Sequence, residues 1–492
     1  GFTCTFCRFC VMIKDTSEIT RAQRTRQRKA VRSVDSRLER FYQSLEGKTV
    51  AFCGIGRSHE EMIRIFCEKG AVVTVRDRRN REALGDTAEK LERWGARLIL
   101  GESYLENLHE DIILRTPGMK FTLPELEAAR EAGSAVTSEM ELFFEFCPCK
   151  IYGITGSDGK TTTTSVIAEL LSAAGKTVHL GGNIGKPLFP QLETIRPEDV
   201  AVAELSSFQL ISMRRSPDVA VVTNVSPNHL DIHKDMDEYV LAKMNVFLHQ
   251  NAFGKAVFNE DNDITLGFVS EARGQALTFS RQKQVPNGAW VDDEGFIRMN
   301  DTRVMRAEDI KIPGLHNLEN YLAAICAVWG DVPVEVIRKV ATTFSGVAHR
   351  AELVRVLDGV AYYNDSIASS PTRTVKGMLS LFPQKIILIA GGYDKHIPYD
   401  SMGPEVVRKV KTLILMGDTA DKIEAAVRKA PEYRDGAPAI VRADCMKTAV
   451  SLAEELSAAG DIVALSPASA SFDMYTDFEA RGNDFKRLVM AL

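Results

Sequence analysis

Short runs of apolar residues recur along the chain, and polar or glycine-rich positions follow each run. Such runs occupy residues 49–53, 71–75, 151–155, 200–205, 219–224, 385–390, 412–416 and 462–466. Continuous apolar strands that alternate with helices are typical of parallel sheets covered on both faces. The pattern therefore predicts an α/β protein whose ligands bind beyond the carboxyl ends of its strands.

The first of these patterns, at residues 48–77, predicts a strand, a glycine turn, a helix and a second strand that ends at Asp77. The turn at residues 54–58 reads Gly-Ile-Gly-Arg-Ser, which is typical of the opening of a nucleotide-binding βαβ unit. His59 stands where the dinucleotide fingerprint has its third glycine. We therefore do not predict NAD, and we expect a single nucleotide diphosphate at this turn.

Composition narrows the class of ligand. The 492 residues carry a net charge of −5, which gives no reason to expect a nucleic acid or an anionic membrane as a partner. No apolar run approaches the roughly 20 residues that span a bilayer. Nine cysteines lack the dense spacing of a secreted disulfide scaffold, which predicts a cytoplasmic protein. Cys4, Cys7 and Cys10 form C-x-x-C-x-x-C, but no partner cluster for a metal follows.

Residues 154–162 read Ile-Thr-Gly-Ser-Asp-Gly-Lys-Thr-Thr, at the end of an apolar strand and the start of a helix. The early glycine of the usual P-loop would fall at Ile154, so a chance glycine turn is the alternative. Glycine-rich backbone, a helix N-terminus, a lysine and a threonine together can bind nucleotide phosphates and magnesium. The predicted phosphate contacts are Gly156, Ser157, Asp158, Gly159, Lys160, Thr161 and Thr162.

Three further residues fall near this loop in the predicted sheet. Glu204 ends an apolar strand, and a buried glutamate is costly unless it is paired or binds a cation, so we expect a Mg²⁺ ligand or a satisfied structural glutamate. His229 follows the next strand on the same sheet edge as Lys160, which favours a functional histidine. Lys243 lies among apolar residues of a helix, so its amine either reaches solvent or is held near metal and substrate.

The compact T-G-x-x-G-K-T loop resembles that of the Mur ligases and folylpolyglutamate synthases, which form amide bonds at the expense of ATP. Other motifs, from about Leu38 to the C-terminus, occur in the order found in the D-glutamate-adding branch of the Mur ligase family. They are Gly181-Gly182-Asn183-Ile184-Gly185, Glu204-Leu205-Ser206-Ser207-Phe208-Gln209, His229-Leu230-Asp231, Gly314-Leu315-His316-Asn317-Leu318-Glu319-Asn320, His349-Arg350, Asn364-Asp365-Ser366, and Ser466-Pro467-Ala468-Ser469-Ala470-Ser471 through Phe478-Glu479-Ala480-Arg481-Gly482.

This resemblance implies a monomeric, three-domain cytoplasmic enzyme of peptidoglycan precursor synthesis. Its substrates would be ATP, UDP-N-acetylmuramoyl-L-alanine and D-glutamate, and an acyl phosphate would be the intermediate. We expect an N-terminal extension at residues 1–37, either disordered or an artefact upstream of the true start. A Rossmann-like domain at 38–138 would bind the UDP substrate, a P-loop-type domain with a mainly parallel sheet at 139–346 would bind ATP and Mg²⁺, and a Rossmann-like α/β domain at 347–492 would bind the amino acid.

The resemblance also assigns roles by motif position. The implied catalytic residues are Lys160, His229, Lys243 and Arg350. The implied ATP contacts beyond the phosphate loop are Asn317, Arg350 and Asp365. The two implied Mg²⁺ sites involve Thr161, Glu204, His229 and a carbamylated Lys243. The implied contacts to the UDP substrate and to D-glutamate are Asp77, Arg79, Asn183, Ser369, Lys395, Ser471 and Phe478.

One motif departs from the family pattern. Many relatives read Asn-Asp-Ser-Lys-Ala-Thr where this chain reads Asn-Asp-Ser-Ile-Ala-Ser, so Ile367 replaces a lysine, and Lys395 is our candidate for the compensating cation. Two alternatives remain open at this point. One is a sister ligase that adds another amino acid to the same nucleotide or to a folate. The other is a catalytically silent homologue that binds nucleotide.

Overall fold

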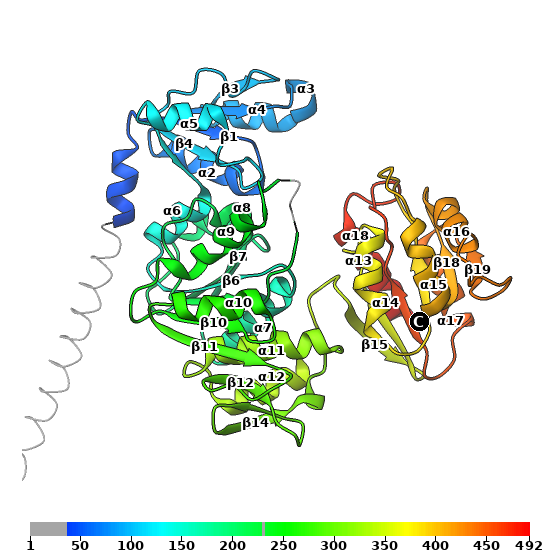
Figure 1. The fold of residues 1–492 in the computed structure, drawn as a ribbon. Coiled ribbons are helices and arrows are strands. Elements are labelled where there is room, and N and C mark those ends of the chain that lie inside the picture. Colours follow the sequence, from blue (N-terminus) through cyan, green and yellow to red (C-terminus); the bar gives the residue numbers. More distant parts are fainter. Residues whose placement is uncertain (1–36, 229–231) are drawn as a thin grey trace, which may run out of the picture. The chain divides into compact units, whose positions relative to one another are not determined.

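The computed structural model describes residues 37–228 and 232–492, and it divides into two compact units (Figure 1). Unit 1 comprises Gly1–Met305 and Glu319–Ile337, and unit 2 comprises Arg306–Leu318 and Arg338–Leu492. The interpretations of residues 1–36, including the three cysteines, and of His229 lie outside the described residues.

The first sheet of unit 1 is parallel throughout, with the strand order β3-β2-β1-β4-β5. Its strands are β1 (Thr49–Cys53), β2 (Val72–Asp77), β3 (Arg97–Leu100), β4 (Ile112–Arg115) and β5 (Ala135–Thr137). The accompanying helices are α2 (Arg57–Glu68), α3 (Arg81–Leu84), α4 (Asp86–Arg93), α5 (Pro124–Glu131) and α6 (Glu139–Phe146).

Alternate residues of β1 face opposite sides of this sheet. Val50 and Phe52 belong to the core cluster that contains residues of α2 and α4, whereas Ala51 and Cys53 belong to the cluster that contains residues of α5. Successive side chains of a strand point to opposite faces, so a strand buried on both faces is apolar at every position. The predicted first strand, residues 49–53, is therefore confirmed together with the reason for its composition.

The second sheet of unit 1 has nine strands in the order β14-β13-β12-β11-β10-β9-β6-β8-β7. They are β6 (Lys150–Thr155), β7 (Val178–Gly182), β8 (Val200–Glu204), β9 (Val219–Val222), β10 (Lys255–Asn259), β11 (Gln275–Ser280), β12 (Gly288–Val291), β13 (Phe296–Met299) and β14 (Thr302–Arg306). The helices of this region are α7 (Lys160–Ala173), α8 (Ser207–Leu210), α9 (Met236–Leu248), α10 (Asp263–Gly267), α11 (Leu315–Val328) and α12 (Val334–Thr343).

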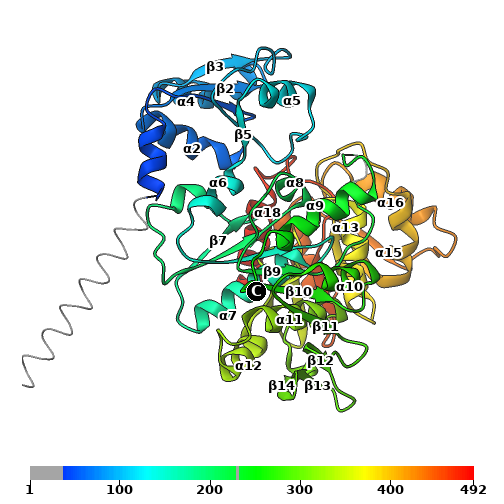
Figure 2. The ribbon, with the colours of Figure 1, turned by 60° about the vertical axis from the view of Figure 1, so that its left-hand side comes forward.

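The pairing from β7 to β12 is parallel, and β13 runs antiparallel to β12. Strands β12 to β14 lie at the end of this sheet that is far from the N-terminal sheet (Figure 2). The expected mainly parallel sheet is thus present, with an antiparallel margin that the apolar pattern did not predict.

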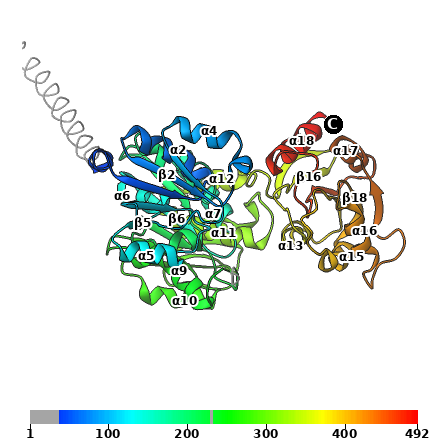
Figure 3. The same ribbon diagram turned by 90° about the horizontal axis from the view of Figure 1, so that it is seen from above.

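The sheet of unit 2 has the order β15-β16-β20-β17-β18-β19. Its strands are β15 (Glu352–Leu357), β16 (Val360–Asn364), β17 (Ile386–Ala390), β18 (Val410–Leu415), β19 (Ala439–Arg442) and β20 (Ile462–Leu465). Its helices are α13 (Pro371–Lys376), α14 (Met378–Leu381), α15 (Gly403–Lys409), α16 (Ala420–Arg428), α17 (Met446–Glu455) and α18 (Phe478–Ala491). Figure 3 shows α17 and α18 on one face of this sheet and α13, α15 and α16 on the other.

Each predicted apolar run coincides with a strand to within about two residues, which confirms an α/β fold rich in parallel strands. Within the described part of unit 2, β15 and β16 form the one antiparallel strand pair, and the other pairs are parallel. The boundaries at residues 138 and 346 stay a prediction. Within the described residues, no helix has the length and apolar composition needed to cross a bilayer.

Candidate nucleotide and metal site

Two glycines bend the chain between β6 and α7. Gly156 and Gly159 follow β6 with φ angles of 152° and 78°, which L side chains rarely adopt. A Cβ atom on Gly156 would lie 1.9 Å from Thr223 Oγ1, and one on Gly159 would lie 2.3 Å from Asn320 Oδ1. Both the backbone and the available space therefore require glycine at these two positions.

The loop is held in place by the segment that follows the neighbouring strand β9. Thr223 Oγ1 donates to Asp158 O at 2.6 Å, and Asp158 N donates to Asn224 Oδ1 at 2.9 Å. Ser157 N donates to Asn224 O at 2.9 Å, and the Ser157 hydroxyl lies 2.9 Å from the Tyr239 hydroxyl. These bonds fix the loop before any ligand binds, which lowers the entropic cost of binding.

Helix α7 begins at Lys160, directly after the loop, and no side chain caps its first N–H groups. Unsatisfied N–H groups and the helix dipole make such a helix start a binding site for anions. Lys160 Nζ donates to Gly156 O and to Ser157 O, both at 3.0 Å, so the cation lies across the loop. Thr161 and Thr162 occupy the first turn and are half-buried. The structure thus places all seven predicted phosphate contacts in one loop and helix start.

The side chain of Lys243, on α9, contacts this loop. Its side chain is 2% exposed, and Nζ donates to Gly156 O at 2.7 Å and lies 4.6 Å from the centre of the Tyr239 ring. The alternative in which the amine reaches solvent is therefore wrong. Burial, together with the positive charge of Lys160, lowers the pKa of Lys243 to about 7, while Asp158 acts in the opposite direction.

Glu204, at the carboxyl end of β8, has one satisfied and one unsatisfied oxygen. Its side chain is almost fully buried, and Oε1 accepts a hydrogen bond from Asn183 Nδ2 at 2.7 Å. Oε2 has no hydrogen-bond partner among the described residues. A buried carboxylate oxygen without a donor is costly, and a bound cation or a water molecule on a cation would remove that cost. The observation favours the cation ligand over the satisfied structural glutamate.

The donor chemistry at this edge of the sheet suits magnesium. In residues 37–228 and 232–492, no three His, Cys, Asp or Glu side chains gather as a preformed metal centre would require. Mg²⁺ needs few protein ligands, because it keeps several waters and binds through one or two carboxylates and substrate phosphates. Glu204 and the hydroxyl of Thr161 fit that donor set, and the second predicted site rests on His229, outside the described residues.

The turn after β1 is built differently. Asp77, at the end of β2, accepts from Ile55 N at 2.7 Å and from Arg79 Nε at 2.9 Å. Burial raises the pKa of Asp77, but the hydrogen bonds from Arg79 and Ile55 outweigh it and hold that pKa below its ordinary value. His59 is fully buried, donates from Nδ1 to Gly54 O at 2.7 Å, and has its pKa lowered by burial to about 4, so the ring is neutral. A buried, neutral imidazole therefore stands in the first turn of α2, at the position where the dinucleotide fingerprint has its third glycine.

A cavity of about 130 Å³ lies between the segment after β4 and helices α8 and α9. Arg115 forms one wall, where it donates to Met119 O at 3.1 Å and to Ser212 Oγ at 2.8 Å. Phe208 and His233 form another, with parallel rings whose centres are 5.2 Å apart. Phe208, a residue of the motif that begins at Glu204, thus lines a pocket together with Arg115 and the segment that follows β4.

In unit 2, Asp365 follows β16 and is buried. Its Oδ2 accepts from Ser466 Oγ at 2.7 Å, and its Oδ1 accepts from Ala351 N at 3.2 Å. Burial raises the pKa of Asp365 to about 7, although these hydrogen bonds and the positive charges of Arg350 and Arg373 act in the opposite direction. The carboxyl group is therefore poised between its two protonation states near neutral pH.

Arg481 on α18 ties together loops at the carboxyl ends of adjacent strands. It is 1% exposed, and it donates to Ser366 O at 2.9 Å, Ala470 O at 2.8 Å and Ser469 O at 3.1 Å. Ser366 Oγ in turn donates to Phe478 O at 2.8 Å. Burial lowers the pKa of Arg481 to about 10, which leaves the guanidinium charged at neutral pH.

The other predicted amino-acid contacts lie at the same edge of this sheet. Ser369, Lys395 and Ser471 follow β16, β17 and β20, which are parallel neighbours. Ser471 is buried, Ser369 is half-buried and Lys395 is exposed. Asn317, at the start of α11, donates from Nδ2 to Pro313 O at 2.6 Å. The structure places these residues but does not test their roles.

Sequence reasoning missed the supporting residues. Thr223 lies at the end of the apolar run 219–224, and Arg481 stands inside a quoted motif, yet neither position showed that its side chain would be buried against a loop. Arg115 ends β4 and is equally buried. A buried arginine has no pattern of its own, because the carbonyls that satisfy it come from distant segments.

Comparisons with known proteins agree with this geometry. Residues 154–328 match the family model described as the Mur ligase middle domain, and residues 349–469 match the Mur ligase, glutamate ligase domain. The UDP-N-acetylmuramoylalanine--D-glutamate ligase of Acetivibrio thermocellus is 50% identical over 93% of this chain and 100% of its own length. The enzyme of the same name from Clostridium beijerinckii is 49% identical over 92% of this chain and 98% of its own.

Solved structures agree at the level of the fold. The UDP-N-acetylmuramate-alanine ligase of Thermotoga maritima has a TM-score of 0.54 at 16% identity, covering 90% of this chain and 99% of its own. A UDP-N-acetylmuramoyl-L-alanyl-D-glutamate--2,6-diaminopimelate ligase has a TM-score of 0.52 at 19% identity, covering 73% of this chain and 87% of its own. With relatives half identical along nearly its whole length, the chain belongs to the Mur ligase family.

Proposed function

We propose that the protein is an ATP-dependent ligase that joins D-glutamate to the L-alanine carboxylate of UDP-N-acetylmuramoyl-L-alanine. One observation carries the ATP half of this proposal: a preformed phosphate loop and a buried carboxylate oxygen without a partner among the described residues share one edge of the central sheet. The names of relatives about half identical to the chain support the choice of D-glutamate. Among our earlier alternatives, a folate or sister ligase is not favoured.

The reaction needs an activated carboxylate. The L-alanine carboxylate attacks the γ-phosphorus of ATP, which forms an acyl phosphate and releases ADP. The amine of D-glutamate then attacks the acyl carbon, loses a proton and expels phosphate, which leaves the amide. Lys160 and the N-terminus of α7 offset the negative charge of the phosphates during the first step. Mg²⁺, held by Thr161, Glu204 and His229, would neutralise further phosphate charge when bound.

Lys243 is proposed to act as a carbamate. Addition of carbon dioxide to a neutral amine gives a carbamate anion and releases a proton, and the lowered pKa keeps much of this amine neutral at pH 7. The anion would place an oxygen ligand beside the phosphate loop, while its N–H still donates to Gly156 O. We expect Lys243→Ala to lose nearly all turnover and formate or acetate to restore part of it. Normal turnover of the variant in buffer free of carbon dioxide would contradict the proposal.

The remaining roles are assigned by position. Asp77, Arg79 and Asn183 are proposed to bind the UDP substrate, Asn317 and Asp365 the nucleoside of ATP, and Arg350 its γ-phosphate. Ser369, Lys395, Ser471 and Phe478 are proposed to bind D-glutamate. The position of three of these residues in loops after adjacent parallel strands supports the last assignment, since ligands of such sheets bind there. We also propose a monomer that acts in the cytoplasm.

Phosphate release with each amino acid offered in turn tests the whole proposal. The full chain receives ATP, Mg²⁺ and UDP-N-acetylmuramoyl-L-alanine, and we expect turnover with D-glutamate at least about 100-fold above that with L-glutamate, L-lysine or meso-diaminopimelate, because an unpaired buried donor penalises the wrong isomer. Lys160→Ala is the control for contaminating ATPase. Equal use of another amino acid would favour a sister ligase, and nucleotide binding without turnover would favour the catalytically silent homologue.

A further inference from the structure

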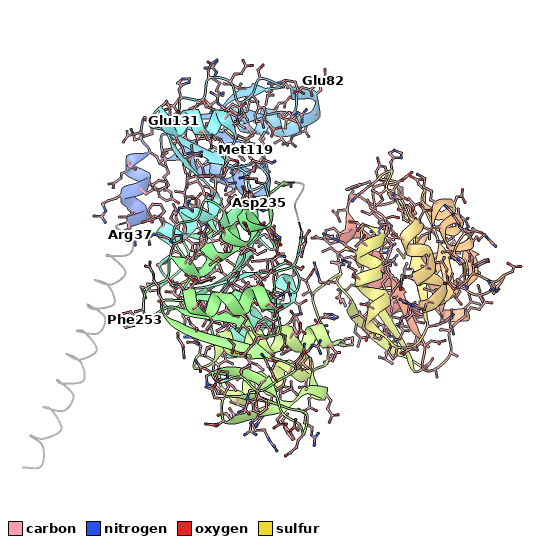
Figure 4. All side chains as sticks on the ribbon, viewed as in Figure 1. Arg37, Glu82, Met119, Glu131, Asp235 and Phe253 are labelled. Carbon is pink, nitrogen blue, oxygen red and sulfur yellow. The ribbon has the colours of Figure 1, made fainter. Side chains whose placement is uncertain are left out.

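A second cavity lies at the opposite end of the central sheet from the phosphate loop. It has a volume of about 640 Å³, within the range of small-molecule sites, and it surrounds the amino ends of β6, β9 and β10. Phe253, whose side chain is labelled in Figure 4, is one of its lining residues and is 97% exposed. At about 3.3 Å per residue, the six residues of β6 separate this cavity from Gly156 by roughly 20 Å. The proposed ligase chemistry uses none of its residues.

Two cysteines in its wall have sulfur atoms in contact. Cys147 caps the C-terminus of α6, Cys149 directly precedes β6, and their Sγ atoms are 3.6 Å apart. Of the cysteines in the described part of the chain, these two form the one such pair. Cys147 is half-buried, whereas Cys149 is 7% exposed. The pair therefore joins a half-buried cysteine to a buried one, and a single proline separates them in the sequence.

A third residue that lines the cavity has a side-chain oxygen that accepts no hydrogen bond from the described residues. Gln250 is 5% exposed, and its Nε2 donates to Pro217 O at 2.8 Å and to Lys255 O at 2.9 Å, which fixes the orientation of the amide. Its Oε1 has no partner among residues 37–228 and 232–492. A buried carbonyl oxygen in a cavity wall is an acceptor for the N–H group of a ligand. The wall of the cavity thus contains an unsatisfied amide acceptor as well as the thiol pair.

We propose that this cavity is a thiol–disulfide exchange site, in which small peptide-like disulfides convert Cys147 and Cys149 to a disulfide. The Cys147 thiolate attacks one sulfur of the small disulfide, which forms a mixed disulfide and releases one thiolate. The Cys149 thiolate then attacks Cys147 Sγ, which forms the intramolecular disulfide and releases the second thiolate. The two protein thiols are oxidised, the small disulfide is reduced, and both protons pass to solvent or to the released thiolates.

The environment of the pair sets the order of these steps. The hydrogen bond between the two thiols and burial both raise the pKa of Cys149, so it is the poorer first nucleophile and the resolving thiol. A disulfide across a single residue closes a small ring, and strained disulfides have oxidising potentials and are readily reduced. The modification is therefore reversible by ordinary small thiols.

Oxidised glutathione is the probe for the test. The background is the full chain with Cys4, Cys7, Cys10 and Cys445 replaced by serine. Of the remaining cysteines, Cys147 and Cys67 are half-buried and the others are buried, so peptide mapping distinguishes the pair from Cys67. Intact mass and peptide mapping follow the reaction at neutral and alkaline pH. We expect a transient mixed disulfide at Cys147 and then loss of both thiols from the peptide that carries the pair, faster as pH rises.

Two single variants separate the steps. Cys149→Ser should stop at a mixed disulfide on Cys147, and Cys147→Ser should react at least about tenfold more slowly, because the remaining thiol is buried. Melting curves show whether each variant is folded, and Cys149→Ala replaces Cys149→Ser if the latter is not. A mixed disulfide that persists in the unaltered pair, or equal rates for the two variants, would overturn the proposal. Neither result bears on ligase turnover, so the two proposals fail separately.

Discussion

In unit 1, the turn after β1 and the loop after β6 both connect an inner strand of a parallel sheet to a helix. Both contain glycines with positive φ, Gly54 at 86° and Gly156 at 152°. They differ in what the neighbouring strand brings to the turn. β2 ends at Asp77, whose carboxylate accepts hydrogen bonds from Ile55 N and Arg79 Nε. β8 ends at Glu204, whose Oε2 has no hydrogen-bond partner in the described structure.

That difference separates two kinds of ligand. A carboxylate satisfied by the protein's own donors costs little and can accept a further hydroxyl, as nucleoside-binding sites require. A buried carboxylate that lacks a donor favours a cation. The same strand–turn–helix pattern can therefore serve a sugar or a metal, and the neighbouring strand decides which.

The largest expected effect follows from Glu204→Gln. The amide keeps the shape but removes the anionic oxygen, so we expect kcat to fall about 10³-fold, or about 4 kcal/mol, with no loss of melting temperature. Phosphate release across a range of Mg²⁺ concentrations measures the first quantity, and a melting curve the second.

Glu139→Gln is the matched control. Glu139 is buried like Glu204, but its Oε1 accepts from Leu188 N and Phe189 N, both at 2.9 Å. We expect this variant to lose stability and keep its turnover per folded molecule. If Glu204→Gln behaved like Glu139→Gln, the contrast between the cation-binding and the structural carboxylate would be wrong.

The second prediction compares the two glycines. A Cβ on Gly156 would lie 1.9 Å from Thr223 Oγ1, and one on Gly54 would lie 2.9 Å from Thr116 Oγ1. We expect Gly156→Ala to lower kcat/KM for ATP about 100-fold, because a misplaced phosphate cradle costs catalysis, and Gly54→Ala to leave it within about threefold. Steady-state kinetics with ATP varied measures both. Equal effects of the two substitutions would mean that the first turn also supports ATP.

The third prediction concerns Asp77→Asn. Loss of the charge that orients Arg79 should raise KM for the UDP substrate about tenfold and leave KM for ATP unchanged, since one charge-assisted hydrogen bond is worth about 1.5–3 kcal/mol. Arg81→Ala, which breaks an exposed ion pair between Arg81 on α3 and Glu92 on α4, is the control and should change neither constant. If only the KM for ATP changed, the assignment of Asp77 to the site of the UDP substrate would be wrong.

The smallest effect is a pH dependence that extends the comparison to unit 2. Asp365 has a pKa near 7 in the fold and near 3.8 when unfolded, so the folded state binds more protons between those values. Its contribution to stability therefore falls as pH rises from about 4 to about 7, by on the order of 4 kcal/mol at most. We expect Asp365→Asn to flatten the pH profile of the free energy of unfolding, measured with urea at several pH values.

Asp77 gives the opposite sign and serves as the control for that profile. Its pKa is lowered in the fold, so its contribution is present above the unfolded pKa and is lost as pH falls through the folded value. Asp77→Asn should therefore lose stability at neutral pH. If Asp365→Asn instead lost more stability, relative to the unaltered chain, as pH rises from about 4 to about 7, the buried carboxyl would be ionised in the fold.

The sequence predicted the strands that end at functional loops, because an inner parallel strand is apolar on both faces and its exit is polar. The predicted runs did not include β12 to β14 or β15, which lie at sheet margins, and they also left out inner strands such as β4, β10 and β16. Lys243 illustrates the same limit within the site. Apolar neighbours on α9 are compatible with an exposed or a buried amine, and only the contact with Gly156 O excluded the exposed one.

By itself, the sequence determined the α/β class, the phosphate loop and the order of motifs, since these depend on residues close together along the chain. Only the tertiary structure decided which oxygen of Glu204 is unsatisfied, which three loop residues accept the four hydrogen bonds of Arg481, and that Cys147 contacts Cys149 in a cavity wall that also contains Gln250. The physical reason is that hydrogen-bond satisfaction and burial are properties of groups brought together from distant segments. A local sequence pattern does not predict which carbonyl, donor or sulfur of a distant segment will contact a given side chain.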